Sequence, residues 1–122
     1  MKKSLLIILA LIATSCAHDV VPKPDQLLSM DQMEAIVYDL SILQAAIQTD
    51  RSYFKEQSIT PLSYVYKKYQ IDSLVYVQND LYYASKPLQY EVIYRRVEKK
   101  LQALKESYDQ EAANASEVPQ IE

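Results

Sequence analysis

The single cysteine, Cys16, is the residue with the clearest chemistry in this sequence. It follows Ala13-Thr14-Ser15, which close an apolar run that begins at Leu5 behind two lysines. A charged start, a short apolar stretch and small residues before a cleavage point make up a secretory signal. A cysteine directly after such a cut is where a bacterial lipid anchor is attached. We therefore expect residues 1–15 to be a lipoprotein signal peptide and Cys16 to be the lipid attachment site.

Other uses of Cys16 fit its surroundings less well. The apolar run falls short of the roughly 20 residues that a membrane-spanning helix needs. The chain has no second cysteine for a disulfide, and a buried or catalytic thiol would need a place within a folded segment. Ala13 stands where such signals most often carry leucine, so ordinary cleavage remains the alternative.

The residue types that enzymes use are sparse. His18 is the only histidine, two residues after the expected anchor, and the chain contains no glycine for a phosphate-binding loop or a nucleophile elbow. Asp31 with Glu34 and the pair Asn79-Asp80 could supply acid–base chemistry, but helix caps and solvated faces use the same residues. No metal-ligand spacing occurs. We predict a protein that is not an enzyme and that has no cofactor, no metal and no small-molecule substrate.

Tyrosine is the other unusual feature, because eight of the 11 tyrosines lie between positions 64 and 94. That number is large for one small core, and tyrosine can bury its ring while its hydroxyl stays in water. Our hypothesis is that Tyr76, Tyr82 and Tyr83 form a surface that binds a partner. The alternative is that all the tyrosines belong to a half-buried core with their hydroxyls at its rim.

Four basic residues, Arg95, Arg96, Lys99 and Lys100, form two adjacent strips on a predicted helix. Such strips are usually solvated, but near a membrane they could contact lipid phosphates. Loss of the signal peptide, with its two lysines, takes the formal net charge from −3 to −5. An acidic exported domain is not expected to bind nucleic acid.

Helices must position these residues, since a chain without glycine lacks the preferred residue of tight hairpin turns. Ser29 with Gln32 makes a capping box that opens a helix over about Met30–Thr49. Thr60-Pro61 begins a short second helix, Asp72 caps a third, and Pro87 begins the fourth. On the third helix an apolar face is expected at Leu74, Val75, Leu81 and Tyr82.

The fourth helix shows the clearest period, with an apolar seam at Tyr90, Tyr94, Val97, Leu101, Leu104 and Tyr108. The first helix has a matching seam. We predict an all-α domain, a small bundle of about four helices in which these two are long and antiparallel and two short helices pack across them. The expected boundaries are a proline-containing, lipid-anchored tether at 16–28, a helical domain at 29–110 and a flexible C-terminal tail at 111–122.

Several short motifs occur in a particular order. Lys23-Pro24 precedes Leu27-Leu28-Ser29, followed by Tyr69-Gln70-Ile71-Asp72-Ser73, then Asp80-Leu81-Tyr82-Tyr83, then Tyr94 and Val97. Together they resemble a family of small Bacteroidota-type lipoproteins known as domain of unknown function 4296. The resemblance implies a helical envelope lipoprotein and no particular activity. Family members commonly have glycine after the Lys-Tyr pair, where this chain has Gln70, so the turn there is expected to be built differently.

The sequence thus favours a protein exported to the bacterial cell envelope, with the outer membrane as the expected site and the side it faces left open. Its expected partners are the membrane, through lipidated Cys16, and another envelope protein. We expect a non-catalytic accessory or adaptor. The alternatives are a chaperone-like holder of exported polypeptides on a tyrosine-rich surface and a purely structural lipoprotein.

Overall fold

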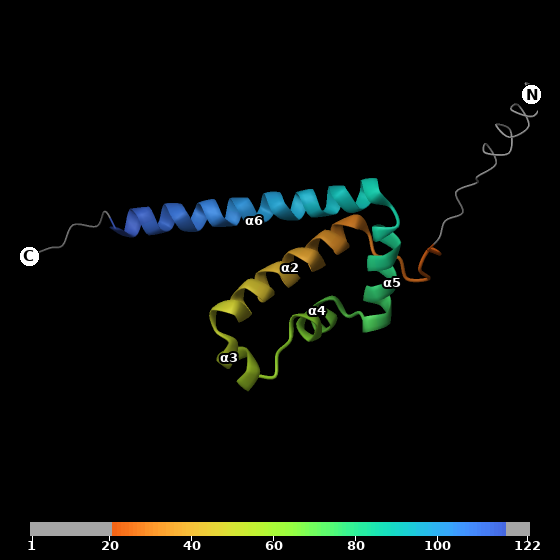
Figure 1. The fold of residues 1–122 in the computed structure, drawn as a ribbon, viewed down its shortest axis with the longest axis horizontal. Helices are drawn as coiled ribbons and strands as arrows, with labels where there is room; N and C mark the ends of the chain where they lie inside the picture. The colour runs from red at the N-terminus through yellow and green to blue at the C-terminus, as the bar shows by residue number, and fades with distance from the viewer. Residues whose placement is uncertain (1–20, 117–122) are drawn as a thin grey trace, which may run out of the picture.

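The structure is a computed structural model that describes residues 21–116, and within this range it consists of helices joined by short turns (Figure 1). The helices are α2 (Met30–Thr49), α3 (Arg51–Glu56), α4 (Pro61–Tyr69), α5 (Ser73–Ala84) and α6 (Pro87–Ser116). No strand occurs in the described part of the chain, so the predicted all-α class is confirmed. The short helix α3 was not predicted; the carboxylate of Asp50, which caps it, accepts a hydrogen bond from the Tyr53 amide at 3.0 Å.

The expected helix starts are confirmed by their caps. The Ser29 hydroxyl accepts a hydrogen bond from the Gln32 amide at 3.1 Å, and the Gln32 side chain accepts one from the Ser29 amide at 2.8 Å. Asp72 accepts a hydrogen bond from the amide of Val75 at 2.8 Å. Each cap satisfies a backbone N–H that has no partner within its helix, which explains why the starts were readable from sequence.

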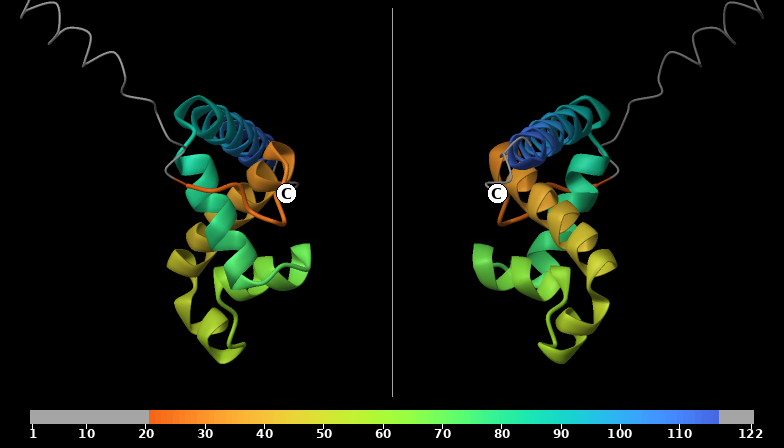
Figure 2. Two further views of the ribbon diagram at one scale, coloured as in Figure 1. Left: turned by 90° about the vertical axis from the view of Figure 1, so that its right-hand side faces the viewer. Right: turned by 90° about the vertical axis from the view of Figure 1, so that its left-hand side faces the viewer.

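The two long helices pack against each other, but they run in the same direction rather than antiparallel. The start of α2 lies beside the stretch of α6 around Arg96, which contacts Asp31, and the two helices diverge toward their C-termini (Figure 1). Figure 2 shows the same pair from the side. The pairing follows this order, since Arg96 contacts Asp31, whereas Lys100, one turn later on α6, contacts Glu34. The physical reason is that α3, α4 and α5 carry the chain back to the start of α2 before α6 begins.

The core gathers around the first half of α2. Its buried members are Leu28, Met33, Ile36, Val37, Val65, Tyr83, Ile93 and Val97. On α6 the buried face contains Ile93, which is 1% exposed, whereas Tyr94 is 43% exposed and Tyr108 is also exposed. The predicted seam was therefore wrong at both tyrosines. The same steps of three and four fit Tyr90, Ile93 and Val97 equally well, and the contact with α2 selects that set.

The inward face of α5 also differs from the prediction. Leu74 and Leu81 are exposed, while Asn79 and Tyr83 are buried. Asn79 is buried because its side chain accepts a hydrogen bond from the Leu28 amide at 2.8 Å and donates one to the Gln26 carbonyl at 2.8 Å. A polar side chain with both groups satisfied can occupy a position where a hydrophobic residue was expected.

The ends of the described range show two features. Pro24 and Leu28 are buried ahead of α2. At the other end α6 continues to Ser116. The expected division into a tether, a helical domain and a C-terminal tail stays a prediction, and residues 117–122 of that tail lie outside the described residues.

Asp39 links α2 to α4. Its carboxylate accepts hydrogen bonds from the Lys68 ammonium at 2.6 Å and from the Tyr69 hydroxyl at 2.8 Å. Burial, together with the neighbouring Asp39 charge, raises the pKa of Tyr69 to about 12. The Tyr69 hydroxyl therefore stays protonated, and it stays a donor, at physiological pH.

Candidate functional site

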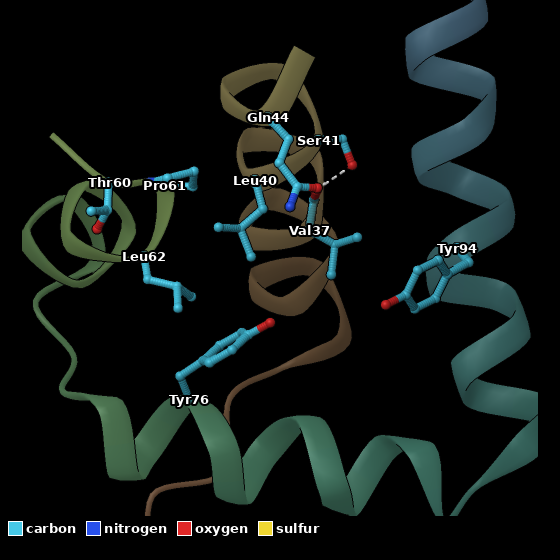
Figure 3. A pocket seen from close by; sticks show the side chains of 9 residues that line it. All are labelled: Val37, Leu40, Ser41, Gln44, Thr60, Pro61, Leu62, Tyr76 and Tyr94. Carbon is cyan, nitrogen blue, oxygen red and sulfur yellow. Dashed lines mark hydrogen bonds between the residues drawn. The ribbon is translucent and has the colours of Figure 1, made fainter. Parts of the chain in front are cut away.

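A groove of about 470 Å³ is bounded by α2, α4, α5 and α6 (Figure 3). Its lining residues are Val37, Leu40, Ser41, Gln44, Thr60, Pro61, Leu62, Tyr76 and Tyr94. None of these side chains is charged, and the groove is open to solvent on one side. Exposed Leu62 contributes an apolar wall without being buried in the core.

Two tyrosines from different helices enter this groove. Tyr76 rises from α5 and Tyr94 projects from α6, with their hydroxyls directed toward each other below Val37 (Figure 3). Behind them, the Tyr66 ring lies 6.1 Å from the Tyr76 ring, and the Tyr90 ring lies 4.5 Å from the Tyr94 ring. The Tyr90 hydroxyl donates a hydrogen bond to the Tyr94 hydroxyl at 3.0 Å. These contacts fix the ring orientations before any ligand binds.

The electrostatics of the tyrosines point to a nearby carboxylate. Burial is the main cause that raises the pKa of Tyr76 and of Tyr94, and the negative charge of Asp80 acts in the same direction on both. Burial also raises the pKa of Asp80 itself, because a half-buried carboxylate loses solvation. The Asp80 side chain forms no hydrogen bond or ion pair with the other residues that the structure describes.

The groove is continued by a second, shallower hollow. Thr60 and Pro61 line both, and the second extends to Ile47, Phe54 and Ile59. The second hollow is also lined by Arg51 and Lys55, so the two hollows together form a track from α6 to α3 that combines apolar side chains with two cations at its α3 end. Such a track matches several successive side chains of a polypeptide better than it matches one compact small molecule.

The three tyrosines of the predicted surface do not act as a set. Tyr83 is 3% exposed and donates a hydrogen bond to the Leu28 carbonyl at 2.7 Å, so its assignment to a binding surface was wrong. Tyr82 is half-buried, packs edge-on against Tyr83 at 5.5 Å, and has the Lys86 ammonium over its ring. Of the three, only Tyr76 lines the groove.

Tyr94, a predicted core residue, joins Tyr76 in the groove. The sequence held a signal that Tyr94 need not be buried, because the neighbouring Ile93 can fill the core position of the same helical turn. Leu40 and Leu62 were not singled out either, since their approach depends on how α4 folds back onto α2.

The basic residues of α6 are largely paired within the domain. Arg96 contacts Asp31 at 3.0 Å and Glu34 at 3.4 Å, and Lys100 contacts Glu34 at 2.6 Å. Arg95 pairs with Glu91 at 3.3 Å on the surface, and Lys99 is exposed. Arg96 and Lys100 therefore stabilise the contact between α2 and α6. A contact of the four cations with lipid phosphates stays a prediction.

The carboxylates considered for acid–base chemistry have structural partners or stand apart. Asp31 and Glu34 belong to the ion pairs with α6, and Asn79 is bonded to backbone groups. Within residues 21–116 no three His, Cys, Asp or Glu side chains come together as metal ligands would. None of the described helices has the length and apolar character required to cross a bilayer. Cys16 and His18 lie outside the described residues.

A family model described as a domain of unknown function (DUF4296) covers residues 24–107, from buried Pro24 to the second half of α6. No curated protein and no solved structure matches the chain.

Proposed function

The chain belongs to the DUF4296 family, and from that premise we propose that it is an exported lipoprotein, anchored through Cys16, that acts as a non-catalytic adaptor. The adaptor binds a segment of another protein of the cell envelope, with the outer membrane as the expected location. The observation that carries this proposal is the open groove between α2, α4, α5 and α6.

The composition of the groove supports a protein partner. Apolar side chains that stay exposed in a soluble domain gain free energy when a partner covers them, and tyrosine is enriched where proteins bind each other. Leu62 and Tyr94 are each more than two-fifths exposed although both face the same hollow. The continuation past Thr60 and Pro61 toward Phe54 suits an extended or helical segment that places several side chains in turn.

The surroundings of the groove support the non-catalytic part of the proposal. Its lining carries hydroxyl and amide groups, but no histidine, carboxylate or amine that could serve as a general base or nucleophile. Asp31 and Glu34 were the carboxylates of α2 considered for acid–base chemistry. Both form ion pairs with cations of α6 instead.

The test is site-specific photo-crosslinking in cells, with the photoreactive amino acid at Gln44 inside the groove and, as a control, at Gln102 on exposed α6. The matched variants are Leu62→Asp and Leu88→Asp. Both leucines are exposed, at 43% and 79%, so neither change should unfold the domain, but only Leu62 lines the groove.

An adaptor should give one dominant envelope protein crosslinked from Gln44, lost in Leu62→Asp and kept in Leu88→Asp. Many weakly captured exported proteins from the same position would support the chaperone-like alternative. The proposal would be overturned if Gln44 captured nothing, or if both aspartate variants lost the product equally.

A further inference from the structure

Asp80 differs from every other acidic side chain that the domain partly buries. Among residues 21–116 there are three of these, namely Glu34, Asp39 and Asp80. Lys100 neutralises Glu34 and Lys68 neutralises Asp39, each at 2.6 Å. Asp80 has no such partner in the described chain. Partial burial of an unpaired carboxylate costs free energy. A positively charged group of a binding partner would therefore stabilise Asp80 in its place beside the groove.

The position of Asp80 connects it to the tyrosines. Asp80 follows Tyr76 by four residues on α5, so the two side chains share one face of the helix. Because α5 runs from α4 toward α6, Asp80 lies one turn closer to the helix that carries Tyr90 and Tyr94. Its charge acts on the phenols of both Tyr76 and Tyr94.

The carboxylate remains accessible. In the described part of the chain no side-chain oxygen or nitrogen is both fully buried and without a hydrogen-bond partner. The oxygens of Asp80 therefore still meet solvent. Asp80 does not itself line the groove but follows Tyr76, which does, by one turn of α5.

We propose that Asp80, with the rings of Tyr76 and Tyr94, binds a basic side chain, an arginine or a lysine, of the polypeptide segment that occupies the groove. This inference rests on the proposed function, because it names the chemistry of the partner that the same groove takes. The cation forms a charge-assisted hydrogen bond with the carboxylate and lies against the faces of the tyrosine rings. The neighbouring apolar residues of the segment pack on Leu40 and Leu62.

The charges of the site favour this occupant over others. The lining of the groove itself contains no basic residue that would repel a cation beside Tyr76 and Tyr94. The cations Arg51 and Lys55 line only the adjoining hollow, at its α3 end. A metal ion fits poorly, because Ca²⁺ takes six to eight oxygen ligands and Asp80 belongs to no cluster of acidic side chains in the described range. An arginine or lysine needs only one carboxylate, and its long apolar stem also matches the walls of the groove.

The test is selection from a library of random peptides displayed on phage, against the full chain purified from membranes in detergent. The variants are Asp80→Asn at the site, Leu62→Asp in the groove, and Glu98→Gln as a control that removes one exposed acidic charge elsewhere on the domain. Thermal unfolding of Asp80→Asn shows whether the fold is kept. We expect its Tm to equal or exceed that of the parent, because the change removes an unpaired, half-buried charge.

The expected result is a set of peptides with arginine or lysine at one fixed position beside apolar residues. Their affinity should fall about tenfold or more in Asp80→Asn and stay unchanged in Glu98→Gln. Peptides that need Leu62 but carry no basic residue, or that bind Asp80→Asn equally well, would overturn the inference and leave the adaptor standing. If no selected peptide depended on Leu62, the adaptor proposal would fail and the inference with it.

Discussion

The hydroxyl of Tyr83 donates a hydrogen bond to the carbonyl oxygen of Leu28 at 2.7 Å, across 55 positions of the sequence. Together with the hydrogen bonds of Asn79, this bond attaches the segment before α2 to the C-terminal half of α5. The link satisfies backbone groups that enter the core without belonging to a helix, which buried backbone requires. It also explains why Tyr83 is part of the core rather than of a binding surface.

We predict that Tyr83→Phe lowers the free energy of unfolding by about 1 to 2 kcal/mol, because the buried Leu28 carbonyl loses its partner. Tyr108→Phe serves as the control, since Tyr108 is exposed and its change should cost roughly nothing. Urea unfolding followed by circular dichroism measures both. Equal stability of the two variants would contradict a structural role for the Tyr83 hydroxyl.

The neighbours Ile93 and Tyr94 should respond in opposite ways to truncation. Ile93→Ala removes a fully buried side chain and should cost about 2 to 4 kcal/mol of unfolding free energy. Tyr94→Ala should cost about 1 kcal/mol or less, because much of its ring already faces the open groove. Thermal and urea unfolding of both variants decide the matter. The reverse order would restore the seam that the sequence periodicity suggested.

Glu34 should make the stability of the domain depend on acidic pH. The hydrogen bond from Lys100, helped by Arg96, holds the pKa of Glu34 below its ordinary value of 4.5. Between the lowered pKa of the folded domain and pH 4.5, the unfolded chain binds more protons than the folded one. The stabilisation that Glu34 gives to the fold is therefore present above about pH 4.5 and is lost as the pH falls toward the lowered pKa.

The corresponding substitution is Glu34→Gln, which we expect to cost about 1 kcal/mol at pH 7 and less as the pH falls below 4. Asp31→Asn is the matched control. Its carboxylate also contacts Arg96 but is 86% exposed, so its loss should change stability by about 0.5 kcal/mol or less. Unfolding curves collected from pH 3 to pH 7 test this. A Glu34→Gln profile parallel to that of the parent would show that the ion pair contributes nothing.

Gln70 occupies a backbone conformation that favours glycine. It ends α4 with φ 53° and ψ 43°, while the amide of the next residue, Ile71, bonds back to the Tyr66 carbonyl at 3.1 Å. The turn is thus the left-handed helix end that glycine commonly makes, built here with glutamine. We expect Gln70→Gly to raise the unfolding free energy by about 0.5 to 1 kcal/mol.

The control for that change is Gln78→Gly in the exposed face of α5, which should instead lower stability by about 1 kcal/mol. Both are measured by chemical unfolding. Destabilisation by both glycines would mean that Gln70 does not hold a left-handed conformation in solution.

Cys16→Ser should convert the protein from a detergent-phase to a water-phase protein in Triton X-114 partitioning. Intact mass of the parent should include the lipid, and that of the variant should not, because serine cannot form the thioether to the lipid. Ser15→Ala keeps the small residue before the cut and should partition like the parent. A Cys16→Ser protein that still entered the detergent phase would place the anchor elsewhere.

Local signals in the sequence were sufficient to predict every described helix except α3. Caps such as Ser29 with Gln32, and the proline at the start of α4, act within a few residues, so their effect is readable without knowing the rest of the fold. The absence of glycine and the three-and-four spacing of apolar residues predicted an all-α domain, because both are properties of the sequence that do not depend on how the helices pack. Helix α3 was not predicted because its six residues are too few to show a recognisable helical spacing of apolar side chains.

The tertiary structure alone decided which of several equally periodic faces became core. Ile93 rather than Tyr94 is buried, and Asn79 occupies an inward position, because contacts with α2 and with the Leu28 backbone select them. It also decided that α2 and α6 run in the same direction and that Tyr76, Tyr94 and Leu62 meet in one groove. These relationships join residues far apart in the chain, and no local propensity encodes them. Their physical basis is the burial of apolar area and the pairing of charges that only the assembled helices provide.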